Sequence, residues 1–151
     1  MLNRITHYRT SHGFGVHSPF AFHFITCVLR EKLPFYDFDR LPDHADRLLY
    51  RVANFFQPAT VGVLGTDKSA VLRMALPGVR MVSSPAEADM TVAWGAVAEP
   101  IPPDCPVLFA VGAPAGRERW RQMQGMTFTN GKVGIAVNRA GLPHQDFTLS
   151  F

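Results

Sequence analysis

Apolar positions recur with a helical period near the start of the chain, in the segment SHGFGVHSPFAFHFITCVLREKLPF. Phe20, Phe24 and Val28 are spaced by four residues, which places them on one face of a helix. Ser18 is a favourable N-cap residue, and Pro19 suits the first helical position. The pattern therefore predicts a first helix that begins after Ser18 and buries a phenylalanine-rich face.

A second helix is predicted between the segment LPD and Pro58. Its apolar stripe consists of Leu48, Leu49, Val52, Ala53 and Phe56. We expect Arg47, Arg51 and Asn54 to lie on its exposed face. Residues 1–58 are expected to form an N-terminal helical segment packed on a core made by residues 59–151, the whole being one domain.

After residue 58 the pattern changes to short apolar runs separated by turn residues. TVGVL, VRMVS, DMTVAW and PVLFAV predict buried strands, and KSAVLRMAL predicts a helix between the first two. Strands that alternate with helices favour a parallel sheet. Another helix is predicted between Arg117 and Gln124, and Asn130-Gly131 between two β-type runs predicts a hairpin. The expected fold is α/β: two helices, then a mainly parallel sheet that ends in a C-terminal antiparallel hairpin.

Composition restricts the class of protein. The chain has 151 residues, of which 47% are hydrophobic and 18% charged, as in a globular domain and unlike a disordered chain. No apolar run approaches the roughly 20 residues that span a bilayer, and the N-terminus lacks the apolar core of a secretory signal. Cys27 and Cys105 show neither metal-ligand spacing nor a disulfide pattern. We expect two reduced, mostly buried thiols in a cytoplasmic protein.

The N-terminal residues are basic, although the net charge of +3 identifies no partner by itself. Residues 1–30 contain no Asp or Glu, so this arm could contact an anion or could be a solvated tail. A metal site needs three or more converging donors. The spacing of His7, His12, His17 and His23 defines no such set, and we expect His23 on the polar side of the first helix.

The segment RERWRQM places a tryptophan among arginines, a composition that can bind nucleic acid through phosphate contacts and base stacking. It is equally typical of an amphipathic helix that buries Trp120 and Met123 against a sheet. No nucleic-acid-binding motif accompanies it, so we favour the buried helix and do not expect a nucleic-acid partner.

The order of these parts resembles a class I S-adenosylmethionine-dependent methyltransferase, whose mainly parallel sheet also finishes with an antiparallel hairpin. HGFGVHSPFAFHFIT, with FYDFDRL after it, is similar to the N-terminal segment of a bacterial O-methyltransferase-like branch. KVGIAVNRAGLPHQDFTLSF is similar to that branch's closing strands, and RERWRQM to the helix before them. The resemblance implies a Rossmann-like sheet. Only SPAEAD separates the second and third strands, where a complete domain of this class has a helix, a strand and another helix. The resemblance therefore implies a reduced sheet that has lost one α/β block.

Since a parallel crossover needs about a dozen residues or more, SPAEAD is too short for one. Either the third strand pairs without an intervening helix, or the sheet order lets the chain cross by a tight loop.

The resemblance also identifies where a methyl donor would bind. Family members carry an acidic residue late in the first strand, where this chain has Val63, followed by a glycine-rich turn. Here the turn retains Gly65, Thr66 and Asp67, but the glycine nearest the helix is replaced by Ser69. Asp67 is placed to cap the following helix with its own carboxylate.

The acidic residue that ends the second strand in the family, and that accepts the ribose hydroxyls, is replaced by Ser83. We therefore take Gly65, Thr66, Asp67 and Ser83 as a vestigial cofactor site. No catalytic pair is visible. The third and fourth strands end without the acidic oxygen ligands of metal-dependent O-methyltransferases, so we expect no metal.

Two functions follow from the resemblance. The chain is expected to be a degenerate methyltransferase-like protein without a cofactor, acting as a binding or interaction module. The alternative is an active small-molecule O-methyltransferase that binds S-adenosylmethionine in a reduced pocket. A missing block would leave VRMVS at a sheet edge and helix faces uncovered, either of which could support a homodimer.

Overall fold

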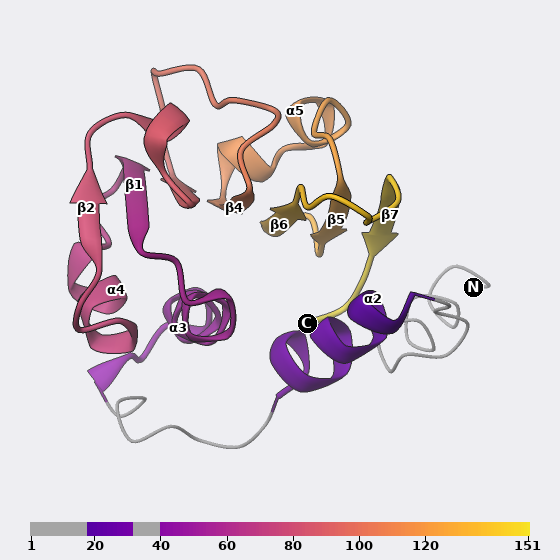
Figure 1. Ribbon diagram of the computed structural model, residues 1–151, viewed down its shortest axis with the longest axis horizontal. Coiled ribbons are helices and arrows are strands. Elements are labelled where there is room, and N and C mark those ends of the chain that lie inside the picture. The colour runs from indigo at the N-terminus through magenta and orange to yellow at the C-terminus, as the bar shows by residue number, and fades with distance from the viewer. Residues whose placement is uncertain (1–17, 32–39) are drawn as a thin grey trace.

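The computed structural model describes residues 18–31 and 40–151 and is drawn in Figure 1. The helical elements are α2 (Pro19–Phe24), the π-helical turn η1 (Ile25–Leu29), α3 (His44–Phe56), α4 (Ser69–Ala75), the short 3₁₀ turns η3 (Pro85–Glu87) and η4 (Ala113–Ala115), and α5 (Arg117–Trp120). The strands are β1 (Thr60–Gly65), β2 (Arg80–Val82), β3 (Met90–Trp94), β4 (Val107–Val111), β5 (Met126–Thr129), β6 (Val133–Val137) and β7 (Gln145–Thr148).

Within the described residues these strands form one seven-stranded sheet in the order β2-β1-β3-β4-β6-β5-β7. Only β6 runs against the others, because it pairs antiparallel with both β4 and β5. The predicted α/β class and mainly parallel sheet are confirmed, as is the β5–β6 hairpin. Its turn is built as the sequence indicated: the Asn130 Oδ1 accepts the backbone N–H groups of Lys132 and Val133 at 2.9 and 2.8 Å.

Helices α2, α3 and α4 cover one face of the sheet, which we call the helix-covered face (Figure 1). The predicted cap of α2 is confirmed, because the Ser18 hydroxyl accepts the N–H of Ala21 at 3.3 Å. Phe24 is fully buried, with its ring centroid 4.8 Å from that of Phe128 on β5. The N-terminal helices thus share one hydrophobic core with the sheet, while the division of the chain at residue 58 stays a prediction.

The predicted exposed face of α3 is only partly correct. Asn54 is exposed, but Arg51 is just 9% exposed. Its Nη1 donates to the carbonyl of Glu31 at 2.9 Å, because the chain that follows η1 passes along this side of α3. Burial lowers the pKa of Arg51 from its ordinary value. The helical period identified the sides of α3 correctly but could not reveal that a second segment covers one of them.

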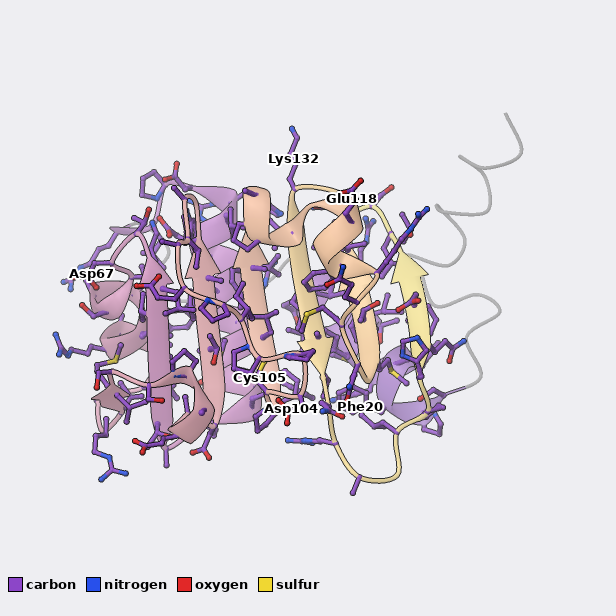
Figure 2. All side chains as sticks on the ribbon, turned by 90° about the horizontal axis from the view of Figure 1, so that it is seen from above. Phe20, Asp67, Asp104, Cys105, Glu118 and Lys132 are labelled. Carbon is purple, nitrogen blue, oxygen red and sulfur yellow. The ribbon has the colours of Figure 1, made fainter. Side chains whose placement is uncertain are left out.

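The opposite, loop-covered face of the sheet is lined by small residues and carries thin connections (Figure 2). Trp120 of α5 lies directly on Gly134 of β6, where an added Cβ would come within 2.6 Å of the indole ring. Trp120 and Met123 are 6% and 8% exposed, so their predicted burial is confirmed, although α5 ends at Trp120 instead of reaching Gln124. An indole held in this way is not free to stack on a base.

Residues 83–89, the crossing segment, connect β2 to β3 across the loop-covered face of β1, which lies between them. The tight crossing is possible because β2 has only three residues, with Val82 opposite Gly62, while β3 begins with Met90 opposite Val61. Between the end of β2 and the start of β3, the chain therefore moves back along the strand direction by only about one residue. The requirement of about a dozen residues applies to strands of full length.

Two features hold the crossing segment in place. The Asp89 Oδ2 accepts the N–H groups of Ala59 and Thr60 at 3.1 Å each, and the Asp89 N–H donates to the Thr60 hydroxyl at 3.0 Å. Gly62 lies underneath, where an added Cβ would be in ordinary contact with Cα of Pro85 at 3.5 Å, so that only a side chain larger than alanine would push the segment away. The tight-loop alternative left open by the sequence is the one observed.

Candidate functional site

The turn after β1 is closed by the backbone of β3. Gly65 has φ +82°, and the N–H of Thr66 donates to the carbonyl of Trp94 at 2.9 Å. A Cβ added to Gly65 would lie 2.1 Å from the carbonyl oxygen of Trp94 and 3.1 Å from that of Ala96. Close packing against β3 therefore requires a glycine at position 65. The carbonyl group of Trp94 occupies the space that a side chain would otherwise fill.

Backbone hydrogen bonds continue along the same edge of the sheet. The N–H of Gly95, after β3, donates to the carbonyl of Val111 at 3.0 Å. The N–H of Gly112, after β4, donates to the backbone carbonyl of Lys132 at 2.9 Å. In open α/β sheets this carboxyl edge is where ligands usually bind. Here the first N–H groups beyond β1, β3 and β4 are each paired with an adjacent segment, so these three groups are not free to bind a ligand.

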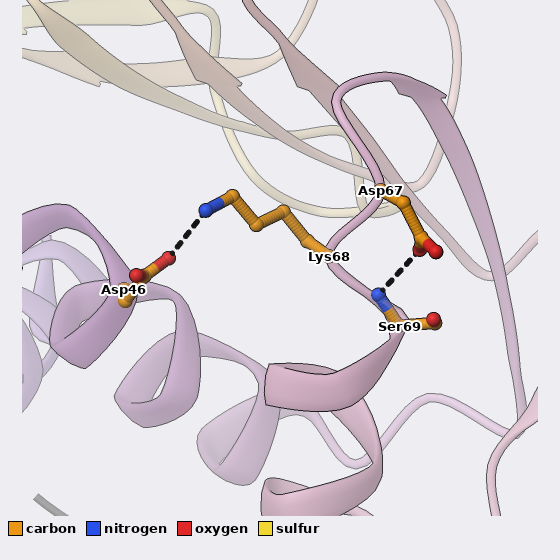
Figure 3. Close-up of polar contacts among 4 residues, drawn as sticks. All are labelled: Asp46, Asp67, Lys68 and Ser69. Atoms are coloured by element: carbon orange, nitrogen blue, oxygen red, sulfur yellow. Dashed lines mark hydrogen bonds and ion pairs between the residues drawn. The ribbon is translucent and has the colours of Figure 1, made fainter. Parts of the chain in front are cut away.

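Asp67 precedes Lys68, the N-cap residue of α4, and its carboxylate accepts the first N–H group of the helix, so the predicted cap is confirmed only in part. Its Oδ1 accepts the N–H of Ser69 at 2.9 Å (Figure 3). This backbone hydrogen bond is the main reason that the pKa of the exposed Asp67 carboxyl is lowered. The start of α4 therefore already carries an anion on one of its free N–H groups, which disfavours a second anion at the same place.

Lys68 forms a compact cluster that sequence reasoning missed. Its Nζ lies 2.9 Å from the Asp46 Oδ1 at the start of α3 (Figure 3) and 4.1 Å from the centroid of the Trp94 ring. The side chains of Lys68 and Asp46 are only 16% and 11% exposed. The cluster joins the Gly65 turn to α3, and the ammonium group occupies the space between a carboxylate and an aromatic face, both of which favour a cation.

Ser83 does not join the other predicted site residues. Gly65, Thr66 and Asp67 share one turn, but the pairing of β1 with β2 ends at Gly62 and Val82. At about 3.3 Å per residue, Ser83 lies roughly 7 Å short of Gly65 along the strand direction. Its side chain is exposed at the start of the crossing segment. The predicted site residues therefore lie on one turn and on the segment that follows the neighbouring strand β2.

Two cavities lined by described residues lie elsewhere. One of about 440 Å³ lies beside α5, over β5 and β7, and one of about 300 Å³ lies at the amino end of the sheet near Phe56, Asp89 and Arg139. Neither is lined by Gly65, Thr66 or Asp67. The predicted cofactor turn and these two cavities are distinct features of the molecule.

The thiols and imidazoles add no site in the described part of the chain. His7, His12 and His17 lie outside the described residues, and His23 is exposed on α2 as predicted. Among the described residues no three His, Cys, Asp or Glu side chains gather closely enough to hold a metal ion. Cys105 is buried, but Cys27 is exposed, contrary to the expectation of two buried thiols. No described helix has the length and apolar character needed to cross a membrane.

No family model, curated protein or solved structure matches this chain. The methyltransferase resemblance therefore depends on the segments HGFGVHSPFAFHFIT, RERWRQM and KVGIAVNRAGLPHQDFTLSF alone. The first of these begins outside the described residues. What the chain does has to be argued from the geometry of its own residues.

Proposed function

We propose that the chain is a degenerate S-adenosylmethionine-dependent methyltransferase-like protein that transfers no methyl group and acts as a binding or interaction module. The observation that carries this proposal is the contact between the Gly65 turn and the Trp94 carbonyl. A glycine at such a turn normally lets the backbone approach a ligand closely. Here the approach is made by the chain itself, which leaves no reason to invoke a cofactor for the glycine.

The charges around the turn support the same conclusion. The methyl donor carries a sulfonium cation and a ribose whose hydroxyls need an acceptor. The Lys68 ammonium group is paired with Asp46, Asp67 is hydrogen-bonded at the start of α4, and Val63 and Ser83 supply no carboxylate late in β1 or after β2. The residues present do not fit the cofactor that the resemblance implies. The short β2 and the crossing segment support a reduced Rossmann-like sheet in which one α/β block has been lost.

Calorimetric titration with S-adenosylmethionine and with its demethylated product tests this proposal. We expect no saturable heat from either compound at the Gly65 turn. A micromolar dissociation constant that weakens in a Thr66→Trp variant would refute the proposal, because Thr66 is exposed beside the turn and a tryptophan there would fill a residual pocket. Thr66→Trp is preferable to any Gly65 substitution, since a side chain at Gly65 would collide with backbone.

The alternative is an active small-molecule O-methyltransferase with a reduced pocket. It would need cofactor contacts from the backbone around Gly65 and from the N-terminal segment, of which residues 1–17 and 32–39 lie outside the described residues. A methyl-transfer assay with catechol and other small acceptors separates the two functions. Turnover that is lost in Thr66→Trp would establish the alternative, and the absence of turnover in the wild type favours the degenerate protein.

An interaction role is supported by the sheet edges. β2 lies at one edge of the sheet, where its outward backbone groups can pair with a second copy. The apolar helix faces give less support, because Phe22, at 48%, is the one large hydrophobic side chain recorded as exposed among the described residues. We propose a homodimer that pairs through the β2 edge. Light scattering at tens of micromolar should give twice the monomer mass, and a clean monomer would count against it.

A further inference from the structure

The loop-covered face ends in a cavity next to α5. This α5 pocket has a volume of about 440 Å³, within the range of about 300–1,000 Å³ typical of small-molecule sites. Its lining residues on strands β5 and β7 include Thr127, Thr129 and Asp146, and Trp120 and Arg121 line it from α5 and the residue after it. The segments that cover this face of the sheet end beside β5 and β7. The polar side chains of these two strands therefore line the pocket opposite Trp120 and Ala115.

Opposite charges line the α5 pocket without pairing to each other. Arg121 is exposed, and the part of the chain that the structure describes gives it no hydrogen-bond or ion-pair partner. Asp146 accepts a 2.6 Å hydrogen bond at Oδ1 from the hydroxyl of Thr127, which is fully buried and therefore holds the carboxylate in a fixed orientation. Its other oxygen, Oδ2, lies 3.8 Å from the exposed His144 Nε2, which is too long for a direct hydrogen bond but forms an ion pair when the imidazole is protonated.

Packing and hydrogen bonds hold two walls of the pocket in place. Trp120 cannot move toward the sheet because its ring lies on Gly134, at a distance that leaves no room for a Cβ. The Thr129 hydroxyl donates to the carbonyl of Val133 at 3.1 Å and accepts the N–H of Gly131 at 3.0 Å. These groups are committed to the β5–β6 turn, so they shape the pocket, while Arg121 and Asp146 remain as its two charged groups.

We propose that the α5 pocket binds a small zwitterion of the free α-amino acid type. Arg121 would hold the carboxylate, Asp146 would hold the ammonium group, and an apolar side chain would lie against Trp120 and Ala115. A simple anion would use only Arg121 and a simple cation only Asp146, whereas a zwitterion would contact both charged groups. In the sheet order, β5 and β7 are separated from β1 by β3, β4 and β6. The site is therefore independent of what happens at the Gly65 turn.

Titrations with L-phenylalanine and L-leucine, followed by calorimetry and by saturation-transfer NMR, test the proposal. Each should bind saturably. L-phenylalaninamide lacks the carboxylate and N-acetyl-L-phenylalanine lacks the ammonium group, so each blocked compound should bind at least about tenfold more weakly than L-phenylalanine. Absence of saturable binding by both amino acids, or equal binding of the blocked compounds, overturns the assignment.

Two charge-neutral variants locate the binding. Arg121→Gln and Asp146→Asn should each weaken L-phenylalanine binding at least about tenfold. Arg73→Gln, an exposed arginine on α4, is the matched control and should leave binding unchanged. All three positions are exposed, and melting curves verify that the variants fold. Binding that survives both Arg121→Gln and Asp146→Asn overturns the site.

The same variant separates this inference from the proposed function. S-adenosylmethionine itself contains an α-amino acid group, so it could give heat by entering the α5 pocket. Heat that Arg121→Gln abolishes belongs to the α5 pocket and supports the present proposal. Heat that persists in Arg121→Gln and disappears in Thr66→Trp belongs to the Gly65 turn and counts against the degenerate function.

Discussion

Replacing Gly65 by alanine should destabilise the protein in the absence of any ligand. The left-handed backbone at φ +82° costs a residue with a side chain roughly 1–2 kcal/mol. The new Cβ would lie 2.1 Å from the Trp94 carbonyl oxygen, where ordinary contact begins at 3.4 Å, so the turn or β3 must shift by more than 1 Å. Such overpacking costs about 1–3 kcal/mol, and the shift weakens the Thr66–Trp94 hydrogen bond, worth about 1 kcal/mol. We expect a loss of stability of roughly 3–6 kcal/mol in total.

Two other glycines provide matched controls. Gly131 has φ +90° with no atom near its Cβ position, so Gly131→Ala should cost only the backbone strain of roughly 1–2 kcal/mol. Gly78 has neither a positive φ nor a near neighbour, and Gly78→Ala should remain within about 1 kcal/mol of the wild type. Urea unfolding of the four proteins measures the series, provided that the m-values agree. If Gly65→Ala is no less stable than Gly131→Ala, the Trp94 carbonyl does not close the turn and our reasoning about the site is wrong.

Three further measurements test other parts of the structure. Lys68→Met and Asp46→Leu should each lower the free energy of unfolding by about 1–3 kcal/mol, because either change leaves a poorly solvated charge without its partner. In urea unfolding, the double variant should lose less than the sum of the two single losses. Burial and the nearby Asp104 carboxylate raise the pKa of the Cys105 thiol from 9.0 to about 11. As the pH rises, the thiol of the unfolded chain therefore loses its proton before the buried thiol of the folded chain does. The free energy of unfolding should fall by about 2 kcal/mol as the pH rises from 9.0 to about 11, and the Cys105→Ala variant should lack that fall. Gly134→Ala should displace the Trp120 indole, which lies 2.6 Å from the new Cβ, and should therefore lower the melting temperature and change the tryptophan fluorescence; an unchanged spectrum would contradict the packing of α5.

Elements that depend on neighbouring residues could be predicted from the sequence. Ser18 begins α2, and Asn130-Gly131 forms the hairpin turn, because the signal and its effect lie within a few residues of each other. The mainly parallel sheet also followed from apolar runs that alternate with helices. The crossing segment was harder, since the prediction assumed full-length strands and the sequence does not reveal that β2 pairs through only three residues.

Contacts between distant residues could not be predicted. Lys68 and Asp46 are 22 positions apart in the sequence. The hydrophobic pattern does not indicate that the start of α3 and the turn after β1 meet beside Trp94. Arg51 was placed in solvent because its own helix says nothing of the chain near Glu31 that covers it. Gly65 shows a more general limit. The sequence alone does not show whether a glycine makes room for a ligand or for the carbonyl group of a neighbouring strand. Only the structure distinguishes the two cases.

The crossing segment also ties three strands of this sheet together. β1 is bonded to β2 on one side and β3 on the other, and the link between those two neighbours passes over one face of it. We therefore expect residues 60–94 to open together, which concerted exchange of the backbone amide protons of β1 and β3 with water would show.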